Sequence, residues 1–221
     1  MIKEKAGTVF RATERNTVVP GCTISRDVYQ GDGYFIYDFA LAEGTSISAE
    51  SYAYPKLILV HSGSAKILLP HLQKEIEVSA GQQIITPTET PVGIAAQEDL
   101  IYTEISLRKD TNMNKVIEAG RVFTLGDLVP YQDGRIVNMD VIDDEHMKFV
   151  VMSFDEGTGL PEHAAPGEAL LTGLGGEGTI VYEGKEHVLH KGENFKFDKG
   201  GAHAVRADRG RFKMALLLTL E

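Results

Sequence analysis

The sequence predicts an all-β protein in which one structural unit occurs twice, and two observations carry this prediction. A shift of 113 residues superposes Ala6-Gly7 on Ala119-Gly120, and the same shift superposes the tripeptide at 43–45 on an identical tripeptide at 156–158. In addition, short segments rich in β-branched and aromatic residues recur along the chain and are bounded by Gly, Pro or Asp. We therefore predict two domains, residues 1–112 and 113–221, joined within the polar stretch 108–115.

The clearest strands are expected at residues 34–41, 56–63 and 147–154, which are short and rich in β-branched and aromatic residues. Residues 179–189 predict a β-hairpin that turns at Glu183-Gly184, because polar residues and a glycine lie between two β-forming runs. Only residues 9–19 and 122–131, at equivalent places in the two copies, predict a turn or so of helix. A strand-rich unit of this size favours a sandwich or barrel.

Composition and charge limit the class of partner. The chain of 221 residues has 32 acidic and 22 basic residues, which gives a net charge of -10. Such a balance disfavours binding to nucleic acid or to an anionic membrane, so a small-molecule ligand is expected instead. The sequence has no apolar run of about 18 residues, and its first residues lack the apolar core of a secretion signal. We therefore expect a cytoplasmic protein, in which the lone Cys22 forms neither an internal disulfide nor a thiolate cluster.

A frame of glycines and histidines recurs in the second copy at Gly157, His163, Gly176, Gly192, Asp198, Gly200 and His203. The first copy matches the same frame at Gly44, Gly63, Gly81 and Pro87. Their spacing resembles the two motifs of the cupin superfamily. The resemblance covers nearly the whole chain and implies a bicupin, that is, two tandem antiparallel β-barrels of the double-stranded β-helix or jelly-roll type. Each barrel would have an apolar pocket open at one end.

The same resemblance implies candidate metal ligands in the second copy. In the family, the first motif usually supplies His-x-His and a following Glu, and the second motif supplies another His, a set that suits Zn, Mn, Fe or Ni. Carried over residue by residue, the set keeps His163 and His203, whereas Ala165 and Ala169 replace the second His and the Glu. Glu168 lies one residue out of register and would face inward only if a bulge reset the strand. We therefore take His163, His203 and Glu168 as candidate metal ligands, with an organic ligand hydrogen-bonded by the imidazoles as the alternative.

The first copy carries other residues at these positions, namely Glu50, Tyr52, Lys56 and Val92. Without imidazoles, and with a lysine at the carboxylate position, this barrel is expected to hold no transition metal. Its expected role is to pack against and shape a homodimer or the partner domain. Glu50 and Lys56 are expected to be solvated rim residues. An ion pair between them, or contact with a polar ligand, is the alternative.

Two functions remain open from the sequence. The first is a small-molecule-binding bicupin whose site lies in the C-terminal barrel, with or without a divalent metal. The second is a metal-dependent cupin enzyme of the dioxygenase or sugar isomerase type, which requires a complete metal ligand set or a positioned acid and base. The expected pocket lining in the C-terminal barrel is apolar, with plain core packing as the alternative, and comprises Phe154, Phe195, Phe197 and Met214. A purely structural role is a third reading, which the absence of a pocket would support.

Overall fold

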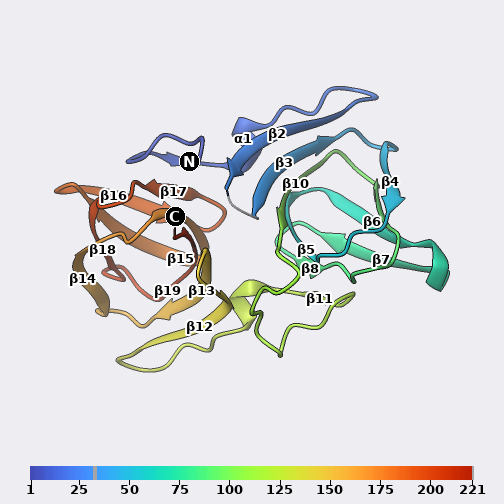
Figure 1. The fold of residues 1–221 in the computed structure, drawn as a ribbon. Coiled ribbons are helices and arrows are strands. Elements are labelled where there is room, and N and C mark those ends of the chain that lie inside the picture. The colour runs from blue at the N-terminus through green and yellow to red at the C-terminus, as the bar shows by residue number, and fades with distance from the viewer. Residues whose placement is uncertain (32–33, 221) are drawn as a thin grey trace. The chain divides into compact units, whose positions relative to one another are not determined.

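The computed structural model describes residues 1–31 and 34–220 and consists mainly of strands (Figure 1). The chain divides into two compact units. The N-terminal unit comprises Met1–Lys3, Ala12–Thr111 and Lys115–Thr124, and the C-terminal unit comprises Glu4–Arg11, Asn112–Asn114 and Leu125–Glu221. Most of the N-terminal unit thus precedes residue 112, and most of the C-terminal unit follows it. Two short segments differ from the division that the sequence predicts, since residues 4–11 belong to the C-terminal unit and residues 115–124 to the N-terminal unit. In the described residues, no helix is long and apolar enough to cross a membrane.

The N-terminal unit contains a six-stranded and a four-stranded antiparallel sheet. The strand orders are β11-β8-β5-β10-β3-β2 and β4-β9-β6-β7. The elements are α1 Ala12–Arg15, β2 Thr23–Gln30, β3 Phe35–Leu41, β4 Ser46–Glu50, β5 Lys56–Ser62, β6 Ser64–Leu69, η1 Pro70–Leu72, β7 Lys74–Ser79, β8 Gln83–Ile85, β9 Val92–Ala96, β10 Leu100–Ser106 and β11 Val122–Phe123. The strand β11 belongs to this unit because Val122 pairs with Ile84 of β8.

The C-terminal unit is built from nine strands in one connected antiparallel sheet, whose main path runs β1-β17-β15-β19-β13-β12. The elements are β1 Val9–Phe10, η2 Leu125–Asp127, β12 Ile136–Asp143, β13 Met147–Phe154, β14 Gly159–Ala164, β15 Glu168–Tyr182, β16 Lys185–His190, β17 Asn194–Phe197, β18 Ala202–Arg206 and β19 Phe212–Thr219. The strand β1 joins this unit because Val9 pairs with Phe195 of β17.

The order of elements follows the internal repeat. Equivalent strands start at equivalent places in the two copies. In the first copy β2 starts at residue 23 and β7 at residue 74, and their equivalents in the second copy, β12 and β16, start at residues 136 and 185. The predicted strands in both copies are confirmed as β3, β5 and β13. The long strand β15 corresponds to β5 and β6 together, which are separated at Gly63. At Gly63 and at its equivalent Gly176 the backbone φ is +76° and +71°, and an added Cβ would lie 2.2 Å and 1.9 Å from a backbone carbonyl oxygen. Both positions of the repeat therefore require glycine.

The predicted hairpin and helical turns are also confirmed. The strands β15 and β16 pair up to Tyr182 and Lys185. Between them, Glu183 and Gly184 both have positive φ, 48° and 74°, as a tight two-residue hairpin turn requires. The helical turns are α1 and the 3-10 helix η2, which lie at the expected places in the two copies.

Each unit has its own apolar core, formed by the alternate residues of its strands that point inward. In the N-terminal unit this core includes Ile58, Ile94 and Tyr102. In the C-terminal unit it includes Ala169 and Leu171 of β15, which are both fully buried. The alternation along β5 turns Lys56 to the same face as Ile58, so a cationic side chain lies beside the core of the N-terminal unit.

Candidate functional site

The two histidines predicted as ligands in the second copy are cross-strand partners. His163 lies on β14 and His203 on β18, and the two residues pair directly in the strand register. Their ring centroids are 4.2 Å apart. The Nδ1 atom of His163 lies 2.8 Å from the carbonyl oxygen of Pro161, and that of His203 lies 3.1 Å from the carbonyl oxygen of Gly201. The structure thus brings the predicted pair together, with Nδ1 of each ring engaged by the backbone.

The environments of these two rings differ. His163 is exposed, whereas His203 is only 4% exposed and stacks on Phe197 with ring centroids 4.1 Å apart. Burial lowers the pKa of His203, and the neighbouring His163 lowers it further, whereas the hydrogen bond to Gly201 raises it. At neutral pH the His203 ring is therefore an uncharged group packed against an aromatic side chain.

The third predicted metal ligand is engaged elsewhere. The Glu168 carboxylate lies 2.7 Å from the ammonium of Lys196, which also lies 3.0 Å from the carboxylate of Asp198. The next residue, Ala169, is in the core, so the alternation of the strand turns Glu168 to the opposite face, and the inward-resetting bulge is not found at this point. The strand β15 is irregular only farther along, between residues 173 and 175.

The described residues of the C-terminal unit therefore lack a complete set of protein ligands for a resident metal. Within residues 1–31 and 34–220, no group of three or more His, Cys, Asp or Glu side chains is arranged to hold a metal ion. Two imidazoles alone fall short of the three protein ligands that catalytic zinc sites normally use.

The aromatic and sulfur side chains expected to line a C-terminal pocket lie in the interior of that unit. All four are at most 1% exposed and belong to its apolar core: Phe154, Phe195, Phe197 and Met214. Three of them contact other aromatic rings, as in the Phe195–Phe197 pair with centroids 5.3 Å apart. Their burial is explained by core packing.

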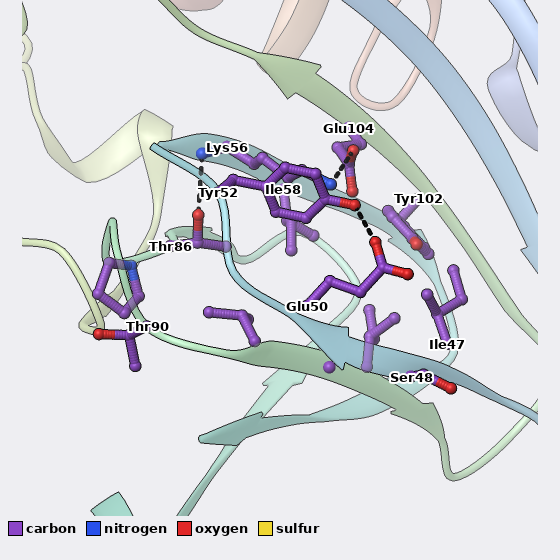
Figure 2. Close-up of a pocket in the computed structure, with 14 residues that line it drawn as sticks. Ile47, Ser48, Glu50, Tyr52, Lys56, Ile58, Thr86, Thr90, Tyr102 and Glu104 are labelled. Atoms are coloured by element: carbon purple, nitrogen blue, oxygen red, sulfur yellow. Dashed lines mark hydrogen bonds and ion pairs between the residues drawn. The ribbon is translucent and has the colours of Figure 1, made fainter. Parts of the chain in front are cut away.

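A pocket lies in the N-terminal unit, at the positions where the resembled family would carry metal ligands (Figure 2). Its lining combines an apolar floor with convergent polar groups and includes Glu50, Tyr52, Lys56, Thr86, Tyr102 and Glu104. These residues come from segments that are distant in sequence. Glu50 lies on β4, Lys56 on β5 and the last two on β10, whereas Tyr52 and Thr86 lie in connecting segments. A concave apolar site with a few polar groups is the usual form of a small-molecule pocket.

Lys56 is fixed in this pocket by two interactions. Its ammonium lies 2.9 Å from a carboxylate oxygen of Glu104, and the two side chains are only 16% and 12% exposed. The same ammonium lies 3.8 Å from the centroid of the Tyr52 ring, within cation–π range. The backbone of Lys56 also exchanges two hydrogen bonds with Thr86, one to its hydroxyl and one from its amide. The expectation that Lys56 is a solvated rim residue is wrong, because Glu104 draws it inward.

Glu50 is hydrogen-bonded to Tyr52, whereas the sequence left open an ion pair between Glu50 and Lys56. The hydroxyl of Tyr52 donates a hydrogen bond to its carboxylate, as Figure 2 shows, while Glu50 itself remains exposed. This hydrogen bond, followed by burial and the charge of Glu50, raises the pKa of Tyr52. Tyr52 therefore stays a neutral phenol that is hydrogen-bonded to the exposed Glu50 carboxylate of the lining.

Tyr102 is the most unusual residue of this pocket. Its side chain is fully buried, its ring stacks on Phe39 with centroids 4.9 Å apart, and its hydroxyl has no hydrogen-bond partner among the described residues. Burial, followed by the charge of Glu104, raises the pKa of the Tyr102 phenol well above its usual value. A neutral hydroxyl, able to donate and accept, is thus held unpartnered in the pocket wall.

Sequence reasoning missed Tyr102 and Glu104 as site residues. A signal was present, because the two residues are two apart in the β-forming run LIYTEIS, which forms β10, and therefore share one face. A carboxylate on the same strand face as apolar residues indicates a buried partner.

Residues 150–219 match the family described as Cupin domain. No match was found among curated proteins. A solved structure of a cupin 2 conserved barrel domain protein from Leptotrichia buccalis is 26% identical, with a TM-score of 0.87 and coverage of 99% of both chains.

Two other solved structures share the fold at lower identity. Protein Ylba from E. coli is 12% identical with a TM-score of 0.59, over 99% of this chain and 95% of its own. A variant of salicylate 1,2-dioxygenase from Pseudoaminobacter salicylatoxidans is 10% identical with a TM-score of 0.59, over 85% of this chain and 70% of its own. With the strand topology described above, these comparisons support a cupin domain at residues 150–219 and an all-β fold of the cupin jelly-roll type.

Proposed function

We propose that this protein is a small-molecule-binding bicupin whose ligand occupies the pocket of the N-terminal unit. The observation that carries the proposal is the buried Tyr102 hydroxyl without a hydrogen-bond partner in the pocket wall. Leaving a buried hydroxyl unsatisfied costs about 1–3 kcal/mol, so such groups are rare in folded proteins. A ligand that accepts from or donates to this hydroxyl would remove that cost on binding.

The rest of the pocket supports a binding role without a metal. Lys56 occupies the position at which the resembled family carries a metal-binding carboxylate, and its ammonium is held by Glu104 and the Tyr52 ring. Such a fixed positive group can hydrogen-bond a ligand, because only one of its three hydrogens is needed for Glu104. Preorganised side chains of this kind lower the entropy cost of binding.

The two-barrel organisation is part of the same proposal. The repeated element order and the equivalent cross-strand pairs Glu50–Val92 and His163–His203 support two cupin barrels, with residues 1–112 and 113–221 as their main parts. Both pairs lie at the same place in the repeat. In one copy the pair carries a carboxylate at the pocket mouth, and in the other it carries two imidazoles.

The binding proposal is tested by screening small molecules for thermal stabilisation of the full chain and repeating the screen on Tyr102→Phe. A ligand that binds only the folded state raises the melting temperature. We expect ligands that stabilise the wild type to lose at least about tenfold in affinity in Tyr102→Phe, equivalent to ~1.4 kcal/mol. The matched control is Tyr131→Phe in the C-terminal unit, which should keep full affinity because Tyr131 is not part of the pocket lining. Equal loss in both variants, or none in either, would exclude this pocket.

The C-terminal histidine pair is the second candidate site, and it is favoured by the 4.2 Å separation of the two rings. Under this alternative the protein is a metal-dependent enzyme of the dioxygenase or sugar isomerase type that uses Zn, Mn, Fe or Ni. The test is elemental analysis and calorimetric titration with each metal on the wild type and on the double variant His163→Ala, His203→Ala. Stoichiometric metal in the first and none in the second would transfer the functional site to the C-terminal unit.

A further inference from the structure

We infer that the pocket of the N-terminal unit selects an uncharged, polyhydroxylated ligand, such as a sugar or polyol, over organic anions and amines. This inference rests on the proposed binding function and concerns the class of ligand. Three features of the pocket carry it: its net charge, the occupant of its cation-binding position, and the arrangement of its hydrogen-bonding groups.

The charge of the pocket disfavours anions. Its lining contains two carboxylates, Glu50 and Glu104, and one ammonium, Lys56. The single ammonium is already neutralised by Glu104 at 2.9 Å, so an anionic ligand would find no unpaired cation in the lining. To pair with Lys56, such a ligand would have to displace Glu104, a carboxylate that is only 12% exposed and would then be buried without its partner.

The position that would suit a ligand ammonium is already filled. An ammonium is best bound beside a carboxylate and over an aromatic face, and here both are occupied by Lys56, which contacts Glu104 and the Tyr52 ring. The remaining carboxylate, Glu50, is exposed, and water and salt weaken its attraction for a cation. A positive charge on the ligand therefore adds little to its affinity.

The hydrogen-bonding groups instead match hydroxyls. The ammonium of Lys56 is a donor and the adjacent carboxylate of Glu104 an acceptor, so two neighbouring ligand hydroxyls could accept from the first and donate to the second. The unpartnered hydroxyl of Tyr102 can take either role. Apolar side chains of the lining, including Ile58 and Ile94, offer a surface for the C–H groups of the same ligand.

The experiment compares ligands that share one scaffold and differ in charge. The probes are D-glucose, D-glucosamine and D-glucuronate, together with D-xylose and myo-inositol, and each is titrated to ~10 mM, a range that detects millimolar dissociation constants. Binding to the full chain is followed by calorimetry and by ligand-observed NMR, and a wider library of organic acids and amines of similar size is screened in parallel. We expect at least one uncharged polyol to bind, with a loss of about tenfold in Tyr102→Phe, and the sugar acid to bind at least about tenfold more weakly, equivalent to ~1.4 kcal/mol.

A charge variant provides the matched control. Glu50→Gln removes this carboxylate charge but keeps a hydrogen-bonding group at the same place, so it should shift the ratio of glucuronate affinity to glucosamine affinity in favour of glucuronate. If the probes that need Tyr102 are acids or amines, the ligand class is wrong and the binding function stands. If no probe or library compound binds in a manner that depends on Tyr102, the proposed function itself is wrong.

Discussion

Replacing Tyr102 with phenylalanine tests the central observation directly, because it removes one hydroxyl and no apolar contact. The ring stacked on Phe39 at 4.9 Å is retained in Tyr102→Phe. A buried tyrosine with a satisfied hydroxyl loses about 0.5–1.5 kcal/mol when that hydrogen bond is deleted. Here the hydroxyl is buried without a partner, so its removal should leave the free energy of unfolding unchanged or raise it by about 1 kcal/mol.

The neighbouring residue on β10 provides a matched control. The hydroxyl of Thr103, which points to the opposite face, donates to Asp38 at 2.6 Å and lies 2.7 Å from Nε2 of His61. The isosteric Thr103→Val therefore removes a hydroxyl with two partners and leaves a buried carboxylate with one donor fewer. We expect Thr103→Val to lose about 2–3 kcal/mol, in contrast to Tyr102→Phe.

The measurement is urea denaturation of both variants, with hydrogen exchange of the β10 amides to report the stability of the N-terminal unit itself. In a thermal scan, 1 kcal/mol corresponds to a shift of about 2–4 °C for a protein of this length. A loss of more than about 1 kcal/mol in Tyr102→Phe would show that the hydroxyl already has a stabilising partner in the free protein. In that case, the argument for a ligand at this position fails.

Lys56→Met should cost about 3–5 kcal/mol because it leaves Glu104 buried without its cation, and the double variant with Glu104→Leu should recover most of that loss in urea denaturation. Burial lowers the pKa of His61 below its usual value near 6.5, so its neutral form is favoured in the folded state and the unfolded chain takes up the proton first. The stabilisation that neutral His61 contributes is therefore present above about pH 6.5 and is lost as the pH falls through the lower folded-state pKa. In His61→Gln, the free energy of unfolding should depend less on pH over this range. Gly63→Ala should destabilise the protein by at least about 2 kcal/mol, because the position has a φ of +76° and an added Cβ would lie 2.2 Å from a carbonyl oxygen. Gly81→Ala is the control, since its added Cβ would have nothing within 4 Å, and it should cost only the backbone strain of about 1–2 kcal/mol.

The sequence indicated the architecture because the signals for it are local and repeated. Apolar β-forming runs bounded by turn residues locate the strands, and the glycines at 63 and 176 are required by close contacts that recur in both copies. The resemblance to the cupin motifs placed His163 and His203 on separate strands as a candidate pair, and the structure shows them as direct cross-strand partners. Side-chain alternation along a strand also gave the correct condition for Glu168, which would face inward only through a bulge that the strand does not have there.

Which groups meet inside each unit was decided only by the tertiary structure. Lys56 and Glu104 are far apart along the chain, and they form an ion pair because β5 and β10 are neighbours in one sheet with a particular register. The unpartnered state of Tyr102 is a property of everything packed around its hydroxyl, and no local pattern contains that information. The exchange of residues 4–11 and 115–124 between units likewise depends on which sheet edge is available for pairing. Local propensity and periodicity thus determine strands and their faces, whereas the partners of buried charges and hydroxyls depend on how distant strands close into one core.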